Sequence, residues 1–146
     1  MKDINYSDLF FTCSLIELIG RERKLARGEV VKYIGKEYLK RIYKYADTLH
    51  CEPIEKVADD YIELCQIPTG EYDNVKKCKY EVPDYWTIGD VYGRLIEDVE
   101  GDSVIDTLME VYQSWISDAI SNYNSDFFYQ SREYIYKCYE ENEILL

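Results

Sequence analysis

The residue types best suited to chemistry in this chain are its single histidine and its five cysteines. His50 precedes Cys51, and a thiol beside an imidazole could form a nucleophilic dyad. However, adjacent residues at a helix end rarely point at each other. The chain has no Cys-x-x-Cys pair, and one histidine cannot form a two-histidine metal motif. We therefore expect reduced, mostly buried cysteines, no bound metal, and a histidine at a helix end.

Carboxylates offer a second route to catalysis, because Asp59, Asp60 and Glu63 lie close together in the sequence. Such spacing is also routine on the solvated face of a helix. Glycine-rich phosphate loops are absent, and Gly89 and Gly93 lie four apart on one face of an expected helix, which predicts close approach by another helix. The sequence therefore predicts no catalytic site and no cofactor. A small enzyme that uses His50 with a cysteine, or these carboxylates, remains an alternative.

Two rows of acids carry more information, because each repeats at i, i+4 and i+8 along an expected helix. The six residues are Glu55, Asp59 and Glu63, then Asp102, Asp106 and Glu110. Like charges stacked on one helix face destabilise that helix by about 0.2–0.5 kcal/mol per pair. Each row is either a solvated surface, matched by the basic residues 21–44, or a docking stripe for a positively charged protein. We take these six as candidate partner-binding residues.

Tyrosine is unusually abundant, with 16 residues among 146. The side chain offers a large contact area with a polar tip, which suits protein interfaces and also the rim of a small helical core. Several tyrosines are interleaved with acids in the sequence. That combination is compatible with a surface that imitates nucleic acid or complements the substrate groove of a toxin.

The net charge of −12 limits the classes of partner. Residues 21–44 contain nine basic and three acidic residues, a net +6, whereas residues 81–146 contain three basic and fifteen acidic residues, a net −12. Nucleic-acid binders must neutralise phosphates with Lys and Arg, so direct nucleic-acid binding is not expected. The expected partner is a protein with a basic surface.

Apolar residues recur at three- and four-residue spacing over most of the chain, which is typical of amphipathic helices. The expected helices cover about residues 8–19, 28–34, 36–48, 53–65, 87–99 and 103–122, with a last one starting at Ser125 or Asp126. Gly20 and Gly35 are expected to end helices. At most a minor β-hairpin is expected near residues 75–82. The predicted fold class is mainly α, a compact bundle of about six or seven helices.

Chain length and hydropathy predict the organisation and location of the protein. A length of 146 residues fits one domain, residues 1–146, that buries its core without disulfides or metal. Apolar runs fall far short of the roughly 18 residues needed to span a membrane. The amino terminus is polar and interrupted by an acid, unlike a secretory signal. We therefore expect a cytoplasmic protein that does not cross a membrane.

Four stretches support a resemblance: Phe11–Arg21, Tyr45–Asp47, Val57–Ile62 and Tyr85–Tyr92. Together they resemble a group of small uncharacterised, acidic helical proteins from gut-dwelling Gram-positive bacteria. The genes of that group tend to lie near candidate toxins, including ones similar to ADP-ribosyltransferases. The resemblance covers roughly residues 8–120 and includes no catalytic motif. It implies an antitoxin-like role without assigning functional residues.

These observations lead to three hypotheses. The first is a non-catalytic binding protein, an antitoxin, immunity protein or other inhibitor that occludes a basic partner with acidic, tyrosine-rich helices. The second is the small enzyme based on His50 or on Asp59, Asp60 and Glu63. The third is a structural or regulatory helical adaptor, and a homodimer is compatible with it.

Overall fold

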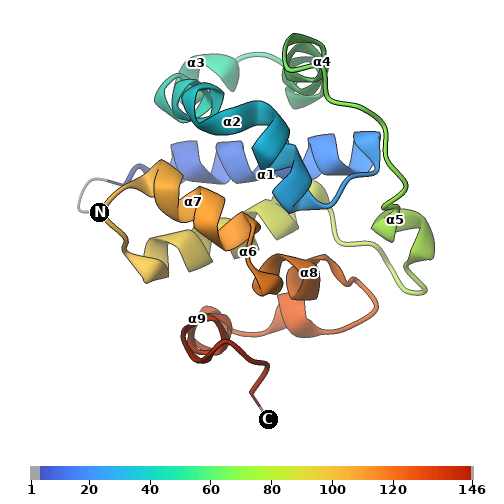
Figure 1. Ribbon diagram of the computed structural model, residues 1–146, viewed down its shortest axis with the longest axis vertical. Helices are drawn as coiled ribbons and strands as arrows, with labels where there is room; N and C mark the ends of the chain where they lie inside the picture. The colour runs from blue at the N-terminus through green and yellow to red at the C-terminus, as the bar shows by residue number, and fades with distance from the viewer. Residues whose placement is uncertain (1–3, 146) are drawn as a thin grey trace.

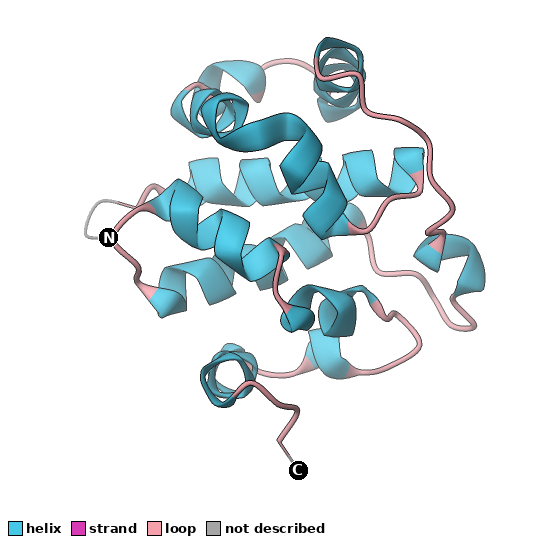
Figure 2. Cartoon of the chain, viewed as in Figure 1, coloured by secondary structure: helices cyan, strands magenta, loops and turns pink. Residues whose placement is uncertain are grey.

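The computed structural model describes residues 4–145, which form nine α-helices and one short 3-10 helix without any strand (Figure 2). In chain order the elements are α1 (Tyr6–Arg23), α2 (Arg27–Lys44), α3 (Ala46–Leu49), α4 (Ile54–Leu64), α5 (Asn74–Lys77), α6 (Tyr85–Val99), α7 (Val104–Tyr112), α8 (Trp115–Ser121), η1 (Phe127–Tyr129) and α9 (Arg132–Glu141). The mainly α prediction is confirmed.

The amino-terminal segment used to predict location begins with residues 1–3, which lie outside the described range. None of the described helices is long and apolar enough to cross a membrane.

Helix α1 is the centre of the fold, and it packs against α2, α4 and α6 (Figure 1). Its residues 11–20 are all buried, so the helix is covered on every side along this stretch. Gly20 was expected to end the helix, and that prediction is wrong because α1 continues to Arg23. A Cβ atom at Gly20 would lie 2.7 Å from Nε of Arg27. The glycine therefore makes room for the Arg27 side chain.

Gly35 does interrupt helical structure, as predicted. Its φ of 80° and ψ of 161° place a kink inside α2. The helix predicted for residues 28–34 is the first half of α2, and the one predicted for residues 36–48 covers the second half of α2 and most of α3. This backbone region is essentially restricted to glycine. The kink lets the second half of α2 continue toward α3 while Val30, Ile34 and Leu39 all remain in the core.

The α1–α6 crossing confirms the prediction drawn from the glycine pair in α6. A Cβ atom at Gly89 would lie 2.8 Å from Cα of Ser14 in α1, and one at Gly93 would lie 3.1 Å from the Tyr6 hydroxyl. Only a residue without a side chain allows the two backbones this close. The crossing fixes the position of α6, which carries much of the candidate site described below.

The single long helix predicted for residues 103–122 is two helices. Ser114 divides them: its hydroxyl donates to the carbonyl of Val111 at 2.7 Å and accepts from the amide of Ile116 at 3.4 Å, which caps α8. At the other end, Ser103 caps α7 by accepting from the amide of Asp106. Asp102 therefore lies before α7. The prediction that Asp102, Asp106 and Glu110 form a row on one helix is wrong for Asp102.

The β-hairpin predicted near residues 75–82 is also wrong, because the segment contains α5 and then an irregular stretch. Asp73 starts α5 by accepting from the amide of Lys76 at 3.0 Å. The Asn124 side chain then accepts from the amide of Lys79 at 2.7 Å and donates to the carbonyl of Lys77 at 3.1 Å. One amide side chain thus takes the hydrogen bonds that a partner strand would have made.

Candidate partner-binding site

Three adjoining pockets line α6 and the segment around η1, and we call them together the aromatic groove. The Tyr80 pocket, of about 560 Å³, is lined by Tyr80, Glu81, Tyr123, Asn124, Ser125, Asp126, Phe128 and Tyr129. The Arg94 pocket, of about 190 Å³, shares Phe128 and Tyr129 with it. The Trp86 pocket, of about 330 Å³, shares Thr87 and Asp90 with the Arg94 pocket. The shared residues make the three pockets neighbours on the surface.

The aromatic groove carries negative charge although two arginines line it. Nε of Arg94 pairs with Asp90 at 3.0 Å. Arg132 binds both oxygens of Asp98, at 3.0 and 2.8 Å, and Glu97 at 2.8 Å. These acids raise the pKa of Arg132. Both guanidinium groups are therefore neutralised within the protein, and the remaining carboxylates set the charge of the groove.

The unmatched carboxylates lie at the two ends of the groove. Glu81 and Asp126 line the Tyr80 pocket, are exposed, and form no ion pair within residues 4–145. Asp84 lines the Trp86 pocket, where its side chain also caps α6 by accepting from the amide of Thr87 at 2.7 Å. A positively charged ligand would find acceptors at both ends.

Aromatic side chains cover the Trp86 pocket. The rings of Tyr6 and Phe10 stack with their centroids 6.3 Å apart, and Phe10 lies 5.5 Å from the Trp86 ring. The Tyr6 hydroxyl donates to a carboxylate oxygen of Asp90. Burial, and then this hydrogen bond, raise the pKa of Tyr6, so the phenol stays protonated at neutral pH.

The tyrosines divide between core and surface. Tyr92 and Tyr112 are completely enclosed, and their rings stack with centroids 4.0 Å apart. Tyr80 and Tyr129, by contrast, are 70% and 73% exposed, the largest exposures among the large hydrophobic residues that the structure describes. Both line the Tyr80 pocket. The sequence predicted that tyrosine could serve either role, and the fold uses both.

The walls of the Tyr80 pocket are joined to each other. Asn124, after α8, holds the chain at Lys77 and Lys79 through the two hydrogen bonds given above. Sγ of Cys78 lies 3.4 Å from the carbonyl of Tyr80 and 3.8 Å from that of Tyr123, within reach of both. The segment that carries Tyr80 is therefore fixed against the segment that carries Tyr129.

A buried ion-pair network lies behind the Tyr80 pocket, and sequence reasoning missed it. Glu17 is fully buried and accepts from Nε and Nη2 of Arg27 at 2.9 and 3.0 Å. Nε of Arg21 donates to the same carboxylate at 2.8 Å, and the Tyr123 hydroxyl donates to it as well. Arg27 also donates to Asn74 at 3.0 Å. This network ties α1 and the start of α2 to α5 and to the floor of the Tyr80 pocket.

Electrostatics keep Glu17 ionised despite its burial. Burial alone would raise its pKa, but the charges and hydrogen bonds of Arg27 and Arg21 outweigh that effect and hold the pKa well below its usual value of 4.5. Burial, and then the negative Glu17, raise the pKa of Tyr123 to about 12. Tyr123 is thus a neutral donor at physiological pH. The only sequence signal was an acid inside an otherwise apolar stretch of α1.

The predicted acids of α4 are exposed, as a docking stripe would require. The Tyr85 hydroxyl donates to Glu55 at 3.1 Å. Partial burial of Glu22, and then its proximity to Asp59 and Glu55, raise the pKa of Glu22. The α4 row therefore continues onto α1 as one acidic patch. Glu63 lies at the exposed end of that row.

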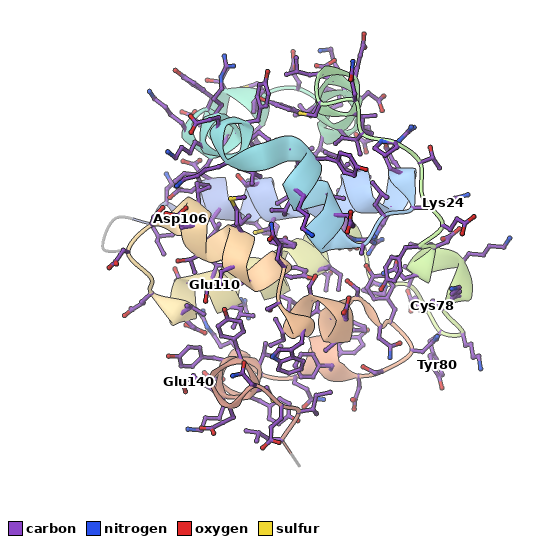
Figure 3. The ribbon with its side chains drawn as sticks, in the orientation of Figure 1. Lys24, Cys78, Tyr80, Asp106, Glu110 and Glu140 are labelled. Atoms are coloured by element: carbon purple, nitrogen blue, oxygen red, sulfur yellow. The ribbon has the colours of Figure 1, made fainter. Side chains whose placement is uncertain are left out.

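The predicted acids of the second row are exposed too, but they do not behave alike. Asp106 pairs with Lys36 of α2 at 2.8 Å, which lowers the pKa of Asp106. Glu110 accepts from the Tyr139 hydroxyl at 3.3 Å, and Asp102 lies before the helix. One acid of this row is therefore matched by the basic segment of the same molecule. Figure 3 shows Asp106 and Glu110 on α7, on the opposite side of the view from Tyr80, so the two surfaces are distinct.

Within residues 4–145, no hydrogen bond joins the His50 ring to a cysteine or a carboxylate, and Asp59, Asp60 and Glu63 all lie on the exposed side of α4. His50 is exposed, and its ring meets the edge of Phe11 with centroids 5.8 Å apart. Cys51 directs its thiol to the carbonyl of Asp47 at 3.6 Å, and Asp60 pairs with Lys56 at 3.1 Å. Within residues 4–145 no group of three acids, cysteines or histidines could hold a metal ion.

The prediction of mostly buried cysteines is only partly right. All five cysteines are free thiols, but only Cys13 and Cys138 are buried. Cys65 and Cys78 are partly exposed, and Cys51 lies on the surface. Burial raises the pKa of the Cys13 thiol to about 12, which keeps it protonated.

Comparisons with protein-family models, with curated proteins and with solved structures found no significant match to this chain.

Proposed function

We propose that this chain is a non-catalytic protein-binding module that holds a basic segment of a partner protein in the aromatic groove. One observation carries the proposal: two exposed tyrosines and two carboxylates that form no ion pair within residues 4–145 line the Tyr80 pocket. Exposed aromatic side chains that line a surface pocket are typical of interaction sites. Unmatched acids beside them select a cationic partner.

The charge distribution supports the same kind of partner. The negative surface extends beyond the groove through exposed acids that do not line it, including Glu55, Asp59 and Glu63. Such charges mainly raise the association rate, whereas the desolvated aromatic contacts set the dissociation rate. The acidic rows are therefore steering charges in this proposal, and the groove is the docking surface.

The resemblance to proteins encoded near candidate toxins supports a specific biological role, that of an antitoxin or immunity protein. An antitoxin or immunity protein inhibits by covering a functional surface of its partner, and an acidic, tyrosine-rich groove suits a basic surface. We propose that the partner is a bacterial protein in the same cytoplasm, and that binding occludes its basic site. Free thiols in the chain suit that reducing compartment.

The test begins with chemical cross-linking and affinity capture in the native host, followed by purification of the captured protein. The association rate constant is then measured by stopped flow at low and at physiological ionic strength. We expect the rate constant to fall steeply as salt is added, because exposed charges are screened over about 8 Å at physiological ionic strength. Replacement of Asp102, Asp106 and Glu110 with Asn, Asn and Gln should slow association and leave the fold intact.

The matched control neutralises Glu140, Glu141 and Glu143, three exposed acids near the carboxyl end. If salt leaves the association rate of wild type unchanged, the partner is not recognised through charge and the proposal is wrong. If the control variant slows association as much as the α7 variant, only net charge matters, and the α7 acids have no special role.

A further inference from the structure

We infer that the Tyr80 pocket binds the guanidinium group of a single arginine side chain supplied by the partner. This inference rests on the proposed function and names the chemistry that the groove recognises. The observation behind it is the combination of Tyr80 and Tyr129 with Glu81 and Asp126 around one pocket of about 560 Å³.

The composition of the pocket matches both parts of an arginine side chain. Tyr80 and Tyr129 are mostly exposed, although the Tyr129 ring centroid also lies 4.4 Å from that of Phe128, so both offer aromatic surface on which a planar cation can stack. Glu81 and Asp126 have no internal ion pair within the described part of the chain and can accept hydrogen bonds from a guanidinium. Phe128 also lines the pocket and adds apolar surface against which the aliphatic stem can pack.

Arginine suits this pocket better than lysine. A guanidinium is planar, weakly hydrated and always charged, and its five donors can reach two carboxylates at once. An ammonium is a compact, strongly hydrated ion that stacks less well on aromatic rings. Two acids contributed by different segments, Glu81 before α6 and Asp126 before η1, favour the forked group.

The chain segments around the pocket are linked to each other before any ligand arrives. Asn124 joins its two walls, and the hydroxyl of Tyr123 is fixed by the buried carboxylate of Glu17. A site that needs no reordering loses less free energy on binding. The other two pockets of the groove are poorer candidates, because Asp90, which both share, already binds Tyr6 and Arg94.

The experiment is an NMR titration of ¹⁵N-labelled protein with N-acetyl-arginine amide. We expect saturable shift changes confined to the amides of residues 80–82 and 124–130, with a dissociation constant of about 1 mM, typical of a small single-group ligand. N-acetyl-lysine amide should bind at least about fivefold more weakly. N-acetyl-citrulline amide, which has the same shape without the charge, should cause no saturable change.

Two variants locate the site. Glu81→Gln with Asp126→Asn should weaken arginine binding at least about tenfold. Glu29→Gln with Asp118→Asn is the matched control, because it removes the same two charges from a separate pocket of about 150 Å³. The control should bind the probe as wild type does. Unchanged amide shifts elsewhere in each spectrum report that the fold is intact.

Three results would overturn the inference. These are shift changes spread over the whole acidic surface, equal binding of arginine and lysine, or wild-type binding by the Glu81 and Asp126 variant. The titration is independent of the proposed function. A specific arginine site in a protein without a basic partner would refute the function alone, and a captured basic partner with no arginine binding here would refute this inference alone.

Discussion

Arg27 supports the sharpest stability prediction, because its guanidinium is buried and makes four short contacts. It donates twice to Glu17, once to Asn74 at 3.0 Å and once to the carbonyl of Leu25 at 2.7 Å. Arg27→Met keeps much of the side-chain volume and removes every one of these donors. The carboxylate of Glu17 would then remain buried with Arg21 as its only cation.

The magnitude follows from this geometry. Removing one partner of a buried ion pair costs about 3–5 kcal/mol, because the other charge is left poorly compensated. For 146 residues the unfolding entropy is about 0.3 kcal/mol per kelvin near the transition. Arg27→Met should therefore lower the melting temperature by about 10–16 °C. The double variant Glu17→Leu with Arg27→Met should recover part of that loss, since it leaves no buried charge at Glu17.

The pH dependence separates this electrostatic effect from lost packing. The pKa of Glu17 is lowered in the folded state, so its contribution is fully present above 4.5 and is lost as the pH falls below that value. In Arg27→Met the pKa of Glu17 rises, because its main cation is gone. The difference in stability between wild type and variant should therefore shrink as the pH falls from 7 to about 3.

Thermal and urea unfolding, followed by circular dichroism across this pH range, provide the measurement. A destabilisation by Arg27→Met below about 1 kcal/mol at pH 7 would refute the reasoning. A difference between wild type and variant that stays constant with pH would also refute it, because the loss would then come from packing and not from the ion pair.

Three further predictions concern backbone contacts and a side-chain bridge. Gly89→Ala should lower the free energy of unfolding by at least about 1–3 kcal/mol in urea denaturation, because its Cβ would press on Ser14. Gly35→Ala should lower the free energy of unfolding by about 1–3 kcal/mol. The added Cβ would meet no neighbouring atom, so the loss would come from backbone strain at a φ of 80°, and a loss near zero would contradict this. Asn124→Ala should accelerate hydrogen exchange of the Lys79 amide, measured by NMR, and unchanged exchange would show that this bridge does not hold the segment.

Local patterns were enough to predict most helices, because their signals lie within a few residues. Apolar spacing predicted α4 and α6 nearly to their ends, and Gly35 predicted the kink in α2. Gly89 was expected inside a helix at a close approach, and its contact with Ser14 confirms this, whereas Gly20 was expected to end a helix. Only the tertiary contact with Arg27 explains why Gly20 stands inside a continuous helix.

The errors arise where distant residues replace local partners. The predicted hairpin failed because Asn124, more than forty positions away, supplies the hydrogen bonds of the segment around Lys79. The error at Asp102 is local instead, because the adjacent Ser103 caps α7 and leaves Asp102 before the helix. No periodicity could reveal that Tyr80 and Tyr129 line one pocket, because α6, α7 and α8 separate them in the chain.

The buried network was hidden for the same reason. Glu17 and Arg27 are ten residues apart and in different helices, and nothing in the sequence distinguishes Arg27 from the other eight basic residues of the segment 21–44. An acid within the buried stretch of α1 was the one available signal, because a buried carboxylate must be paired. That signal predicts that Glu17 pairs with a cation, but it does not show that the cation is Arg27.

The central claim, that the aromatic groove binds a basic partner, is tested most directly by replacing its two exposed tyrosines. The captured partner is titrated against Tyr80→Ala with Tyr129→Ala, and against the matched control Tyr33→Ala with Tyr45→Ala, whose tyrosines are exposed elsewhere on α2 and at its end. The groove variant should lose at least about tenfold in affinity, as expected for aromatic hot spots. The control should bind like wild type. Equal affinity of the groove variant and wild type would contradict the account.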